Sequence, residues 1–225
     1  MDSMYKAPIV LEALVKPSKG TVILIHGLGD SGAGWLPTAK QIQRAIPSAK
    51  FILPNAPNAP VTMNMGMVMP SWYDILTLED KAKQDFNGLE KSKAYFLSLI
   101  KAEADSGVQS EKIILMGFSQ GGACSLYTGY SCPYKLGGIV SLSGYLPIAE
   151  RFHERLDKTN INTPFLLCHG LVDDLIKTRW SRESSEILKN AGIPGELRFY
   201  KNLGHFTSEE EISDVTGWLR NRIES

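Results

Sequence analysis

The sequence predicts an α/β fold built on a mostly parallel central sheet with helices on both faces. Short apolar segments alternate with amphipathic ones along the 225 residues, as in strands joined by helical crossovers. The composition, 43% hydrophobic and 21% charged, suits a globular domain with a sizeable core. The segment 112–122 runs from an apolar stretch through Gly-Phe-Ser-Gln-Gly into small residues, a strand-turn-helix pattern.

The first half of the chain contains two predicted strands and two predicted helices. Residues 21–26 are a β-branched apolar run, followed by a glycine-rich loop and a helix over residues 35–46. Residues 51–54 predict a short strand. Residues 55–73 form a proline- and methionine-rich connection, which is longer than loops usually are without a function. A long amphipathic helix is predicted over residues 80–106.

The second half continues the alternation of strands and helices. A strand over residues 112–116 leads into a helix over 122–130; further strands are predicted over 138–142, 164–168 and 196–200, and helices over 177–191 and 209–223. No internal repeat, low-complexity segment or linker interrupts the chain, so we expect one domain over residues 1–225. Reactive groups in such sheets belong at the carboxyl ends of the strands.

Charge and composition argue against several classes of partner. Lys plus Arg and Asp plus Glu both total 24, so no excess of positive charge favours nucleic acid. No stretch approaches the roughly 18 apolar residues of a membrane span, which leaves a transient encounter with a membrane surface open. The three cysteines form no CxxC pair and fit reduced thiols, so we expect a cytoplasmic protein, with the nucleus as a second location. The oligomeric state stays open.

The turn at Ser119 is the strongest candidate for chemistry. In a nucleophile elbow, a serine sits on a sharp strand-to-helix turn, and glycines two positions to either side let the backbones pack closely. Gly117 and Gly121 occupy those two positions. The alternative, a glycine-rich turn without chemistry, is disfavoured by the apolar strand before it and the helix after it.

A serine hydroxyl needs a base and a carboxylate that orients the base. Of the four histidines, His205 alone follows the best aspartate candidates, in a loop ahead of the last helix, as the chain order Ser, Asp, His requires. The carboxylate then comes from Asp173 or its neighbour Asp174, after the strand 164–168. We favour Asp173, with Asp174 facing solvent or capping the next helix.

Two backbone N–H groups must face the developing oxyanion. We expect them from Gln120, which follows the nucleophile, and from Leu28 in the loop after the first strand. That loop also matches a dinucleotide-binding fingerprint at Gly27, Gly29 and Gly32. A ribose-binding acid should follow about twenty residues on, yet residues 31–73 contain no Asp or Glu. We therefore expect no cofactor, and no metal.

With these motifs in place, the chain resembles the acyl-protein thioesterase family, the lysophospholipase/carboxylesterase type of serine hydrolase. The resemblance covers nearly the full length of the chain. The supporting motifs are His26-Gly-Leu-Gly-Asp-Ser-Gly, Pro54-Asn-Ala-Pro, Pro60-Val-Thr, Gly66, Ser71-Trp-Tyr-Asp-Ile, Gly117-Phe-Ser-Gln-Gly-Gly, Gly137-Gly-Ile-Val-Ser-Leu-Ser-Gly, His169-Gly and Gly204-His.

The resemblance implies an α/β-hydrolase fold and cleavage of fatty-acyl thioesters from S-acylated protein cysteines. It also implies Ser119 as nucleophile, Asp173 as acid and His205 as base, with Leu28 and Gln120 as oxyanion donors. In relatives, the proline-rich segment borders the acyl channel. We hypothesise an acyl groove lined by Met65, Met67, Trp72, Ile75, Leu76 and Tyr145.

Three features depart from the family pattern. His169-Gly-Leu-Val-Asp-Asp stands where relatives usually have His-Gly-Asp-x-Asp-Pro, which changes the neighbours of Asp173. Asn202 stands where a glycine is common, and Asn tolerates a left-handed backbone. The first cysteine is Cys124, so the amino-terminal Cys that is palmitoylated in some relatives is missing.

Two other functions fit the same residues. A carboxylesterase or lysophospholipase acting on lysophospholipids or small acyl esters would carry the same triad, because the acyl-enzyme is hydrolysed identically whichever group has left. A hydrolase fold that binds acylated proteins without turning them over is disfavoured by an intact Ser119, Asp173 and His205.

Overall fold

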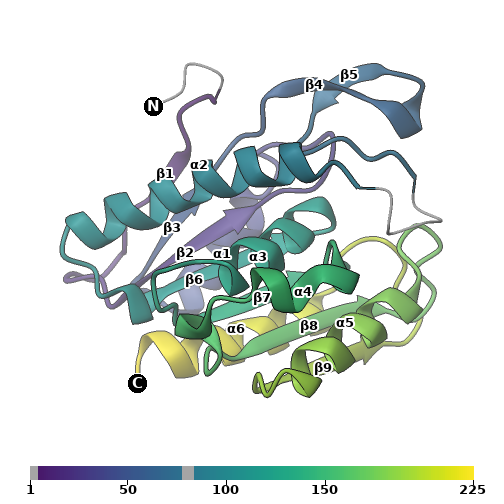
Figure 1. Cartoon of the computed structure of the whole chain (residues 1–225). Coiled ribbons are helices and arrows are strands. Elements are labelled where there is room, and N and C mark those ends of the chain that lie inside the picture. Colours follow the sequence, from purple (N-terminus) through teal and green to yellow (C-terminus); the bar gives the residue numbers. More distant parts are fainter. Residues whose placement is uncertain (1–4, 78–83) are drawn as a thin grey trace.

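The computed structural model describes residues 5–77 and 84–225. Its centre is a seven-stranded sheet with the order β1-β3-β2-β6-β7-β8-β9 (Figure 1). β1 is antiparallel to β3, and the other neighbours are parallel, which confirms the predicted sheet. The strands are β1 (Ile9–Leu11), β2 (Gly20–Ile25), β3 (Ala49–Leu53), β6 (Ile113–Phe118), β7 (Gly138–Leu142), β8 (Phe165–Gly170) and β9 (Gly195–Tyr200).

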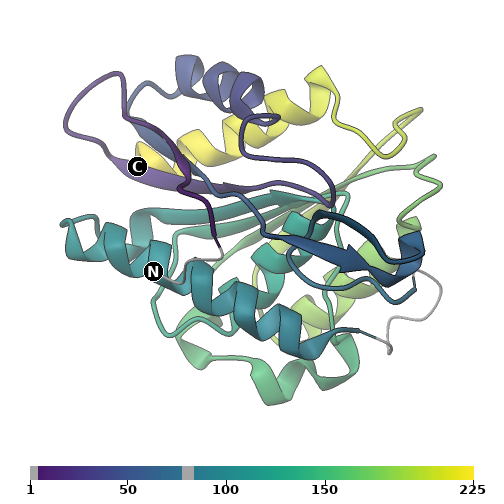
Figure 2. The same cartoon turned by 90° about the horizontal axis from the view of Figure 1, so that it is seen from above.

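Helices cover both faces of the sheet, as Figure 2 shows. α1 (Leu36–Ala45) and α6 (Glu209–Ile223) pack on one face, and α2 (Phe86–Asp105), α3 (Gln120–Tyr130) and α5 (Thr178–Asn190) on the other. Side chains alternate along β2, so Val22 and Leu24 contact the first layer while Ile23 and Ile25 contact the second. The short elements are α4 (Phe152–Arg155) and the one-turn helices η1 (Thr62–Asn64), η2 (Ser110–Lys112), η3 (Ala149–Arg151) and η4 (Lys158–Asn160).

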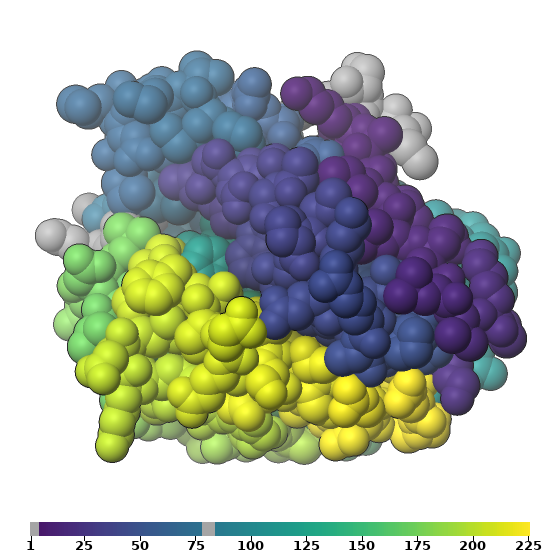
Figure 3. Space-filling model, turned by 180° about the vertical axis from the view of Figure 1, so that it is seen from behind, coloured from purple at the N-terminus to yellow at the C-terminus, as the bar shows by residue number. Residues whose placement is uncertain are grey.

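The connection predicted over residues 55–73 is not a plain loop. It contains an antiparallel hairpin of β4 (Asn58–Val61) and β5 (Met67–Pro70), which is the blue projection at the upper left of Figure 3. Proline has no N–H to donate, so it weakens a strand prediction, but a two-stranded ribbon tolerates Pro60 and Pro70 because each strand has one partner.

The helix predicted over residues 80–106 begins later, at Phe86. Asp85 caps α2, because its Oδ1 accepts a hydrogen bond from the Gly88 N–H at 2.9 Å. Its Oδ2 also accepts the Asp74 N–H at 3.0 Å, which ties the start of α2 to the segment after the hairpin. Residues 80–83 of the predicted helix lie outside the described residues.

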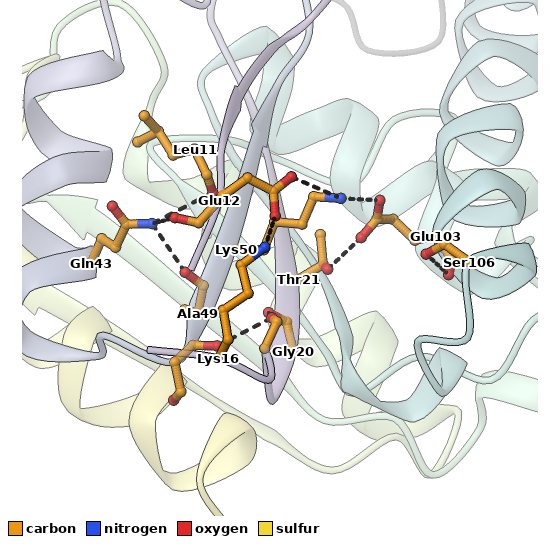
Figure 4. Close-up of polar contacts among 12 residues, drawn as sticks. Leu11, Glu12, Lys16, Gly20, Thr21, Gln43, Ala49, Lys50, Glu103 and Ser106 are labelled. Atoms are coloured by element: carbon orange, nitrogen blue, oxygen red, sulfur yellow. Dashed lines mark hydrogen bonds and ion pairs between the residues drawn. The ribbon is translucent and has the colours of Figure 1, made fainter. Parts of the chain in front are cut away.

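A polar network joins the amino-terminal end of the sheet to α2 (Figure 4). Lys50 on β3 places Nζ 2.7 Å from Glu103 Oε1, and Thr21 on β2 donates to Glu103 Oε2 at 2.6 Å. Glu103 is buried and Lys50 is largely covered. The network lies at the opposite end of the strands from the elbow and connects two strands and a helix there.

Candidate active site

Ser119 lies at the junction of β6 and α3, on a strained backbone. Its φ is 53° and its ψ is −117°, a region that L-residues rarely adopt. Two hydrogen bonds hold this conformation: the Ser119 N–H donates to the Leu142 carbonyl at 2.8 Å, and the Ser119 carbonyl accepts from the Ala123 N–H at 3.0 Å. The serine is therefore fixed to the neighbouring strand β7 and to the first turn of its own helix.

The glycines around Ser119 are required by close backbone contacts. A Cβ at Gly121 would lie 2.1 Å from the Ile25 carbonyl oxygen, and one at Gly117 would lie 2.2 Å from the Gly121 carbonyl oxygen. No side chain fits at either position without moving the backbone. The elbow thus packs directly against the end of β2, where the glycine-rich loop begins.

His205 faces Ser119 from the loop between β9 and α6. Its Nε2 lies 2.9 Å from Ser119 Oγ, and its Nδ1 lies 2.8 Å from Asp173 Oδ2. The ring centroids of His205 and Phe118 lie 4.9 Å apart, so the imidazole also contacts the residue that precedes Ser119. Asn202, in the same loop, adopts a φ of 57°, within the left-handed region that this residue type tolerates.

Asp173 lies in the turn after β8, and its side chain is fully buried. Its Oδ1 accepts the N–H groups of Leu175 at 3.0 Å and Ile176 at 2.8 Å, which leaves Oδ2 for His205. Burial raises the pKa of Asp173, but the hydrogen bonds from His205 and Ile176 outweigh it, so the pKa is lowered and the carboxylate stays charged. Asp174 is exposed, as expected of the neighbour.

A second histidine touches this carboxylate, and sequence reasoning missed it. His169 is fully buried; its Nε2 lies 2.8 Å from the Ile176 carbonyl oxygen and 3.4 Å from Asp173 Oδ2. Because a carbonyl oxygen can only accept, Nε2 carries the hydrogen. Burial lowers the pKa of His169, so the ring stays neutral. Its position directly after the β8 core, four residues before Asp173, was the available signal.

Two backbone N–H groups beside Ser119 remain free. Within residues 5–77 and 84–225, neither the Leu28 N–H nor the Gln120 N–H has a hydrogen-bond partner. Gln120 is the first residue of α3, where N–H groups have no partner within the helix. These are the two donors that the sequence predicted, and both belong to segments that adjoin the elbow.

The loop that carries Leu28 is fixed from both sides by buried polar contacts. His26 is buried; its Nδ1 donates to the Gly27 carbonyl at 2.7 Å and its Nε2 accepts from the Ala56 N–H at 3.1 Å. Burial lowers the pKa of His26, consistent with this neutral form. On the other side, the Gly29 N–H donates to the Pro70 carbonyl at 2.8 Å.

The Gln120 side chain joins the elbow to the segment after the hairpin. Its Oε1 accepts the Trp72 N–H at 3.0 Å, and its Nε2 donates to Ser71 Oγ at 3.1 Å and to the Tyr73 carbonyl at 2.7 Å. The Trp72 indole in turn donates to the His26 carbonyl at 2.8 Å. One buried network therefore connects the two segments that carry the free N–H groups with residues 71–73.

The six residues of the hypothesised acyl groove fall into two groups. Met65, Met67 and Leu76 are exposed, with 95% of Met65 accessible to solvent at the hairpin tip. Trp72, Ile75 and Tyr145 are buried together in the core on the α2/α3 side of the sheet. Two other methionines of the hairpin segment, Met63 and Met69, pack against that core.

The remaining candidate groups show no second reactive site. His153 is exposed on α4, and the three cysteines are free and buried. Within the described ranges, no group of three or more His, Cys, Asp or Glu side chains is arranged to hold a metal ion. None of the helices in those ranges is long and apolar enough to cross a membrane.

Comparison with known proteins gives consistent relatives. A family model described as Phospholipase/Carboxylesterase matches residues 8–223. The chain is 45% identical over 213 residues to acyl-protein thioesterase 1 of Yarrowia lipolytica, covering 90% of this chain and 92% of that protein. It is 45% identical over 206 residues to acyl-protein thioesterase 1 homolog 1 of Dictyostelium discoideum, covering 90% of each. The crystal structure of Zea mays acyl-protein thioesterase 2 superimposes with a TM-score of 0.87 at 29% identity, covering 97% of this chain and all of that one.

Proposed function

Because this chain belongs to the phospholipase/carboxylesterase family of α/β-hydrolases, we propose that it is an acyl-protein thioesterase, which removes fatty-acyl groups from S-acylated protein cysteines. The chemistry rests on one observation, the hydrogen-bonded chain from Ser119 through His205 to the buried Asp173. The substrate class rests on relatives named acyl-protein thioesterase that span nine-tenths of the chain.

The geometry supports a two-step mechanism through an acyl-serine. His205 Nε2 accepts the Ser119 proton as Oγ attacks the acyl carbonyl carbon, and Asp173 stabilises the imidazolium that forms. When the tetrahedral intermediate collapses, the C–S bond breaks and the cysteine thiolate takes the proton from His205. Water, deprotonated by the same imidazole, then attacks the acyl-serine. The C–O bond to Ser119 breaks, Oγ takes the proton back from His205, and a fatty acid is released.

The free N–H groups of Leu28 and Gln120 are the proposed oxyanion donors. Both are backbone groups, so they are already oriented before the substrate binds. Each such donor is worth roughly 3 kcal/mol of barrier in serine hydrolases. Gln120 begins α3, so the positive end of the helix dipole adds to the stabilisation of the negative oxygen.

The acyl chain is proposed to bind between the elbow and the hairpin. Trp72, Ile75 and Tyr145 would form the inner wall, with Met65, Met67 and Leu76 at the outer edge. The double variant Met65→Ala/Met67→Ala should change the relative turnover of short and long acyl substrates, because both side chains are flexible and apolar. An unchanged profile across acyl lengths would remove the two methionines from the site.

A second candidate function is hydrolysis of lysophospholipids or small carboxylic esters. The family description itself names phospholipases and carboxylesterases. Purified protein should be assayed on a palmitoylated peptide and on lysophosphatidylcholine at matched concentration. Faster cleavage of the peptide is expected, whereas cleavage of the lipid alone would contradict the leading proposal.

A fluorophosphonate probe separates an enzyme from a non-catalytic acyl-binding protein. Such probes phosphonylate a serine that an adjacent base activates. We expect labelling of the wild type and none of Ser119→Ala, with Ser143→Ala labelled like the wild type. Absence of labelling in the wild type would support the binding protein instead.

The surroundings of the site also bear on where the protein acts. Exposed apolar residues flank the segments that carry Asp173 and His205, namely Leu171, Val172, Leu175 and Phe206. They support a transient encounter with a membrane surface, from which acylated substrates are reached. The free, buried cysteines support a reducing compartment such as the cytoplasm or nucleus.

A further inference from the structure

An apolar cavity lies away from Ser119, between the amino-terminal segment and the outer side of α2. Its volume is about 470 Å³, within the usual range for small-molecule sites. Tyr5 and Lys6 line it from the amino-terminal segment, and Lys91, Ala94, Tyr95 and Leu99 line it from α2. Figure 2 shows this purple segment approaching the teal helix.

The charged side chains that line the cavity are both basic. Lys6 and Lys91 are exposed, and neither forms an ion pair within the described part of the chain. No acidic residue lines the cavity to balance them. The cavity therefore combines an apolar wall with two unbalanced ammonium groups, which suits an anion with an apolar body.

The hydroxyl of Tyr95 is covered from solvent and does not open into the cavity. The residue is 9% exposed, and its hydroxyl has no hydrogen-bond partner among residues 5–77 and 84–225. Burial raises the pKa of Tyr95 to about 12, so the hydroxyl keeps its proton at neutral pH. Tyr95 therefore lines the cavity with its other atoms and adds no charge to it, and a carboxylate would be held by the two lysines.

The aromatic wall of the cavity continues toward the oxyanion loop. Tyr5 stacks on Tyr95 with ring centroids 3.9 Å apart, and Tyr95 lies parallel to Trp72 at 6.3 Å. Trp72 is hydrogen-bonded to both Gln120 and the His26 carbonyl. The cavity is thus separate from Ser119 but shares a packed wall with the segments that carry the two free N–H groups.

From these contacts we propose that the cavity is a binding site for a long-chain fatty acid, with its carboxylate at Lys6 and Lys91 and its alkyl chain along Ala94, Tyr95 and Leu99. The choice of a fatty acid among amphipathic anions rests on the proposed function, since a fatty acid is the product released from the acyl-serine. The presence of a site for an amphipathic anion rests on the cavity itself.

The test is calorimetric titration of laurate into protein whose Ser119 has been blocked with a small fluorophosphonate. We expect one remaining site whose affinity rises about fourfold per methylene from octanoate to laurate, as burial of successive methylenes requires. Dodecyltrimethylammonium, which has an alkyl chain of the same length but a positive head, should bind at least tenfold more weakly. Equal binding of the cation would contradict the role of the lysines.

Matched variants locate the site on the chain. Ala94→Trp fills the cavity and should weaken laurate binding at least tenfold, whereas Ala102→Trp, exposed further along α2, should not. Lys6→Glu/Lys91→Glu should weaken it similarly at low salt, with Lys40→Glu/Lys135→Glu as the charge control. Normal fluorophosphonate labelling of each variant before blocking checks its fold.

The outcomes separate this proposal from the function of Ser119. If blocked protein binds no laurate, or if Ala94→Trp leaves laurate binding unchanged, the cavity is not the site. If the cavity binds laurate while wild-type protein cleaves no acyl substrate, the proposed function fails and the binding site stands.

Discussion

At the scale of single residues, Asp173 is held by more groups than the proposed triad requires. Besides His205, it is contacted by two backbone N–H groups and by the buried His169. The Nε2 hydrogen of His169 is directed at the Ile176 carbonyl and lies near Asp173 Oδ2, so this ring packs the turn against the carboxylate. We interpret His169 as a residue that positions the acid.

Replacement of His169 should therefore slow the reaction without removing the nucleophile. His169→Gln is expected to lower kcat about tenfold, the size of one lost hydrogen bond near a charged group, with a smaller effect on KM. Steady-state kinetics on an acyl thioester measures both, and His153→Gln on the exposed α4 is the control. A change in KM alone, with kcat unchanged, would contradict a positioning role.

Glu211, in the first turn of α6, is a buried carboxyl group whose effect on the free energy of unfolding depends on pH. It is fully buried, and neither carboxyl oxygen has a hydrogen-bond partner within the described part of the chain. Burial raises its pKa from 4.5 to about 8. The folded protein thus keeps a proton that the unfolded chain releases, so the stability contribution of Glu211 falls as the pH rises from about 4.5 to about 8.

Removing this titration should stabilise the protein at alkaline pH. Glu211→Gln is expected to raise the free energy of unfolding by about 2 kcal/mol at pH 8.5 and by much less at pH 5. Urea denaturation at both pH values measures the difference, with the exposed Glu210→Gln as control. An equal gain at both pH values would show that ionisation of Glu211 is not the cause.

At the scale of elements, the parallel strands could be predicted from the sequence, but the edge strand β1 and the β4–β5 hairpin could not. The runs that became β2, β6, β7 and β8 are continuously apolar because helices cover both of their faces. β1 has three residues, and the β4–β5 hairpin contains Pro60 and Pro70, so neither shows a clear period. These segments form strands because their backbones pair with a neighbouring strand, β3 in the case of β1 and each other in the case of β4 and β5.

Some residues of the candidate site could likewise be selected from their order in the sequence, whereas other contacts of the site could not. Ser119, Asp173 and His205 could be selected because each follows a recognisable strand in a fixed order. The contacts of His26 and the Gln120 side chain could not, because they join these residues to loops from other parts of the chain. The contacts of His169 are local, but they depend on how the turn after β8 folds back. Burial of a polar side chain is visible only once the sheet is assembled.

The link between α3 and the segment after the hairpin can be tested through Gln120. Gln120→Met removes three buried hydrogen bonds and leaves the Trp72 N–H unpaired, whereas the Tyr73 carbonyl keeps its hydrogen bond from Ser71 Oγ, so stability should fall by about 2–3 kcal/mol. The preference among acyl lengths should also change, because Trp72 borders the proposed groove. Urea denaturation and turnover of short and long thioesters measure the two effects; Gln109→Met, exposed before η2, is the control. Lost stability with an unchanged length preference would separate this network from the groove.

At the scale of the whole molecule, the Lys50–Glu103 pair holds β3 and α2 together far from the chemistry. Lys50→Met would leave the buried Glu103 carboxylate without its cation and should cost about 3 kcal/mol in stability. The double variant Lys50→Met/Glu103→Leu should recover most of that loss, because no buried charge remains. Lys101→Met, whose partner Asp105 is exposed, should have little effect in the same denaturation assay. If the double variant were as unstable as the single one, the loss of stability could not be due to the unpaired Glu103 carboxylate alone.

The three residues of the proposed triad are divided along the chain by β9, because Ser119 and Asp173 precede this strand and His205 follows it. Ser119 follows β6 and Asp173 lies in the turn after β8, whereas His205 follows β9, which pairs with β8 alone at the edge. A break in the turn between α5 and β9, near Gly192, would leave Ser119 and Asp173 on one polypeptide and His205 on a short second one. We expect neither fragment to hydrolyse a chromogenic ester alone, and hydrolysis to return when they reassociate. If so, the two fragments could serve as a split reporter: each would be fused to one of two proteins, and hydrolysis of the chromogenic ester would report that the two proteins bind each other.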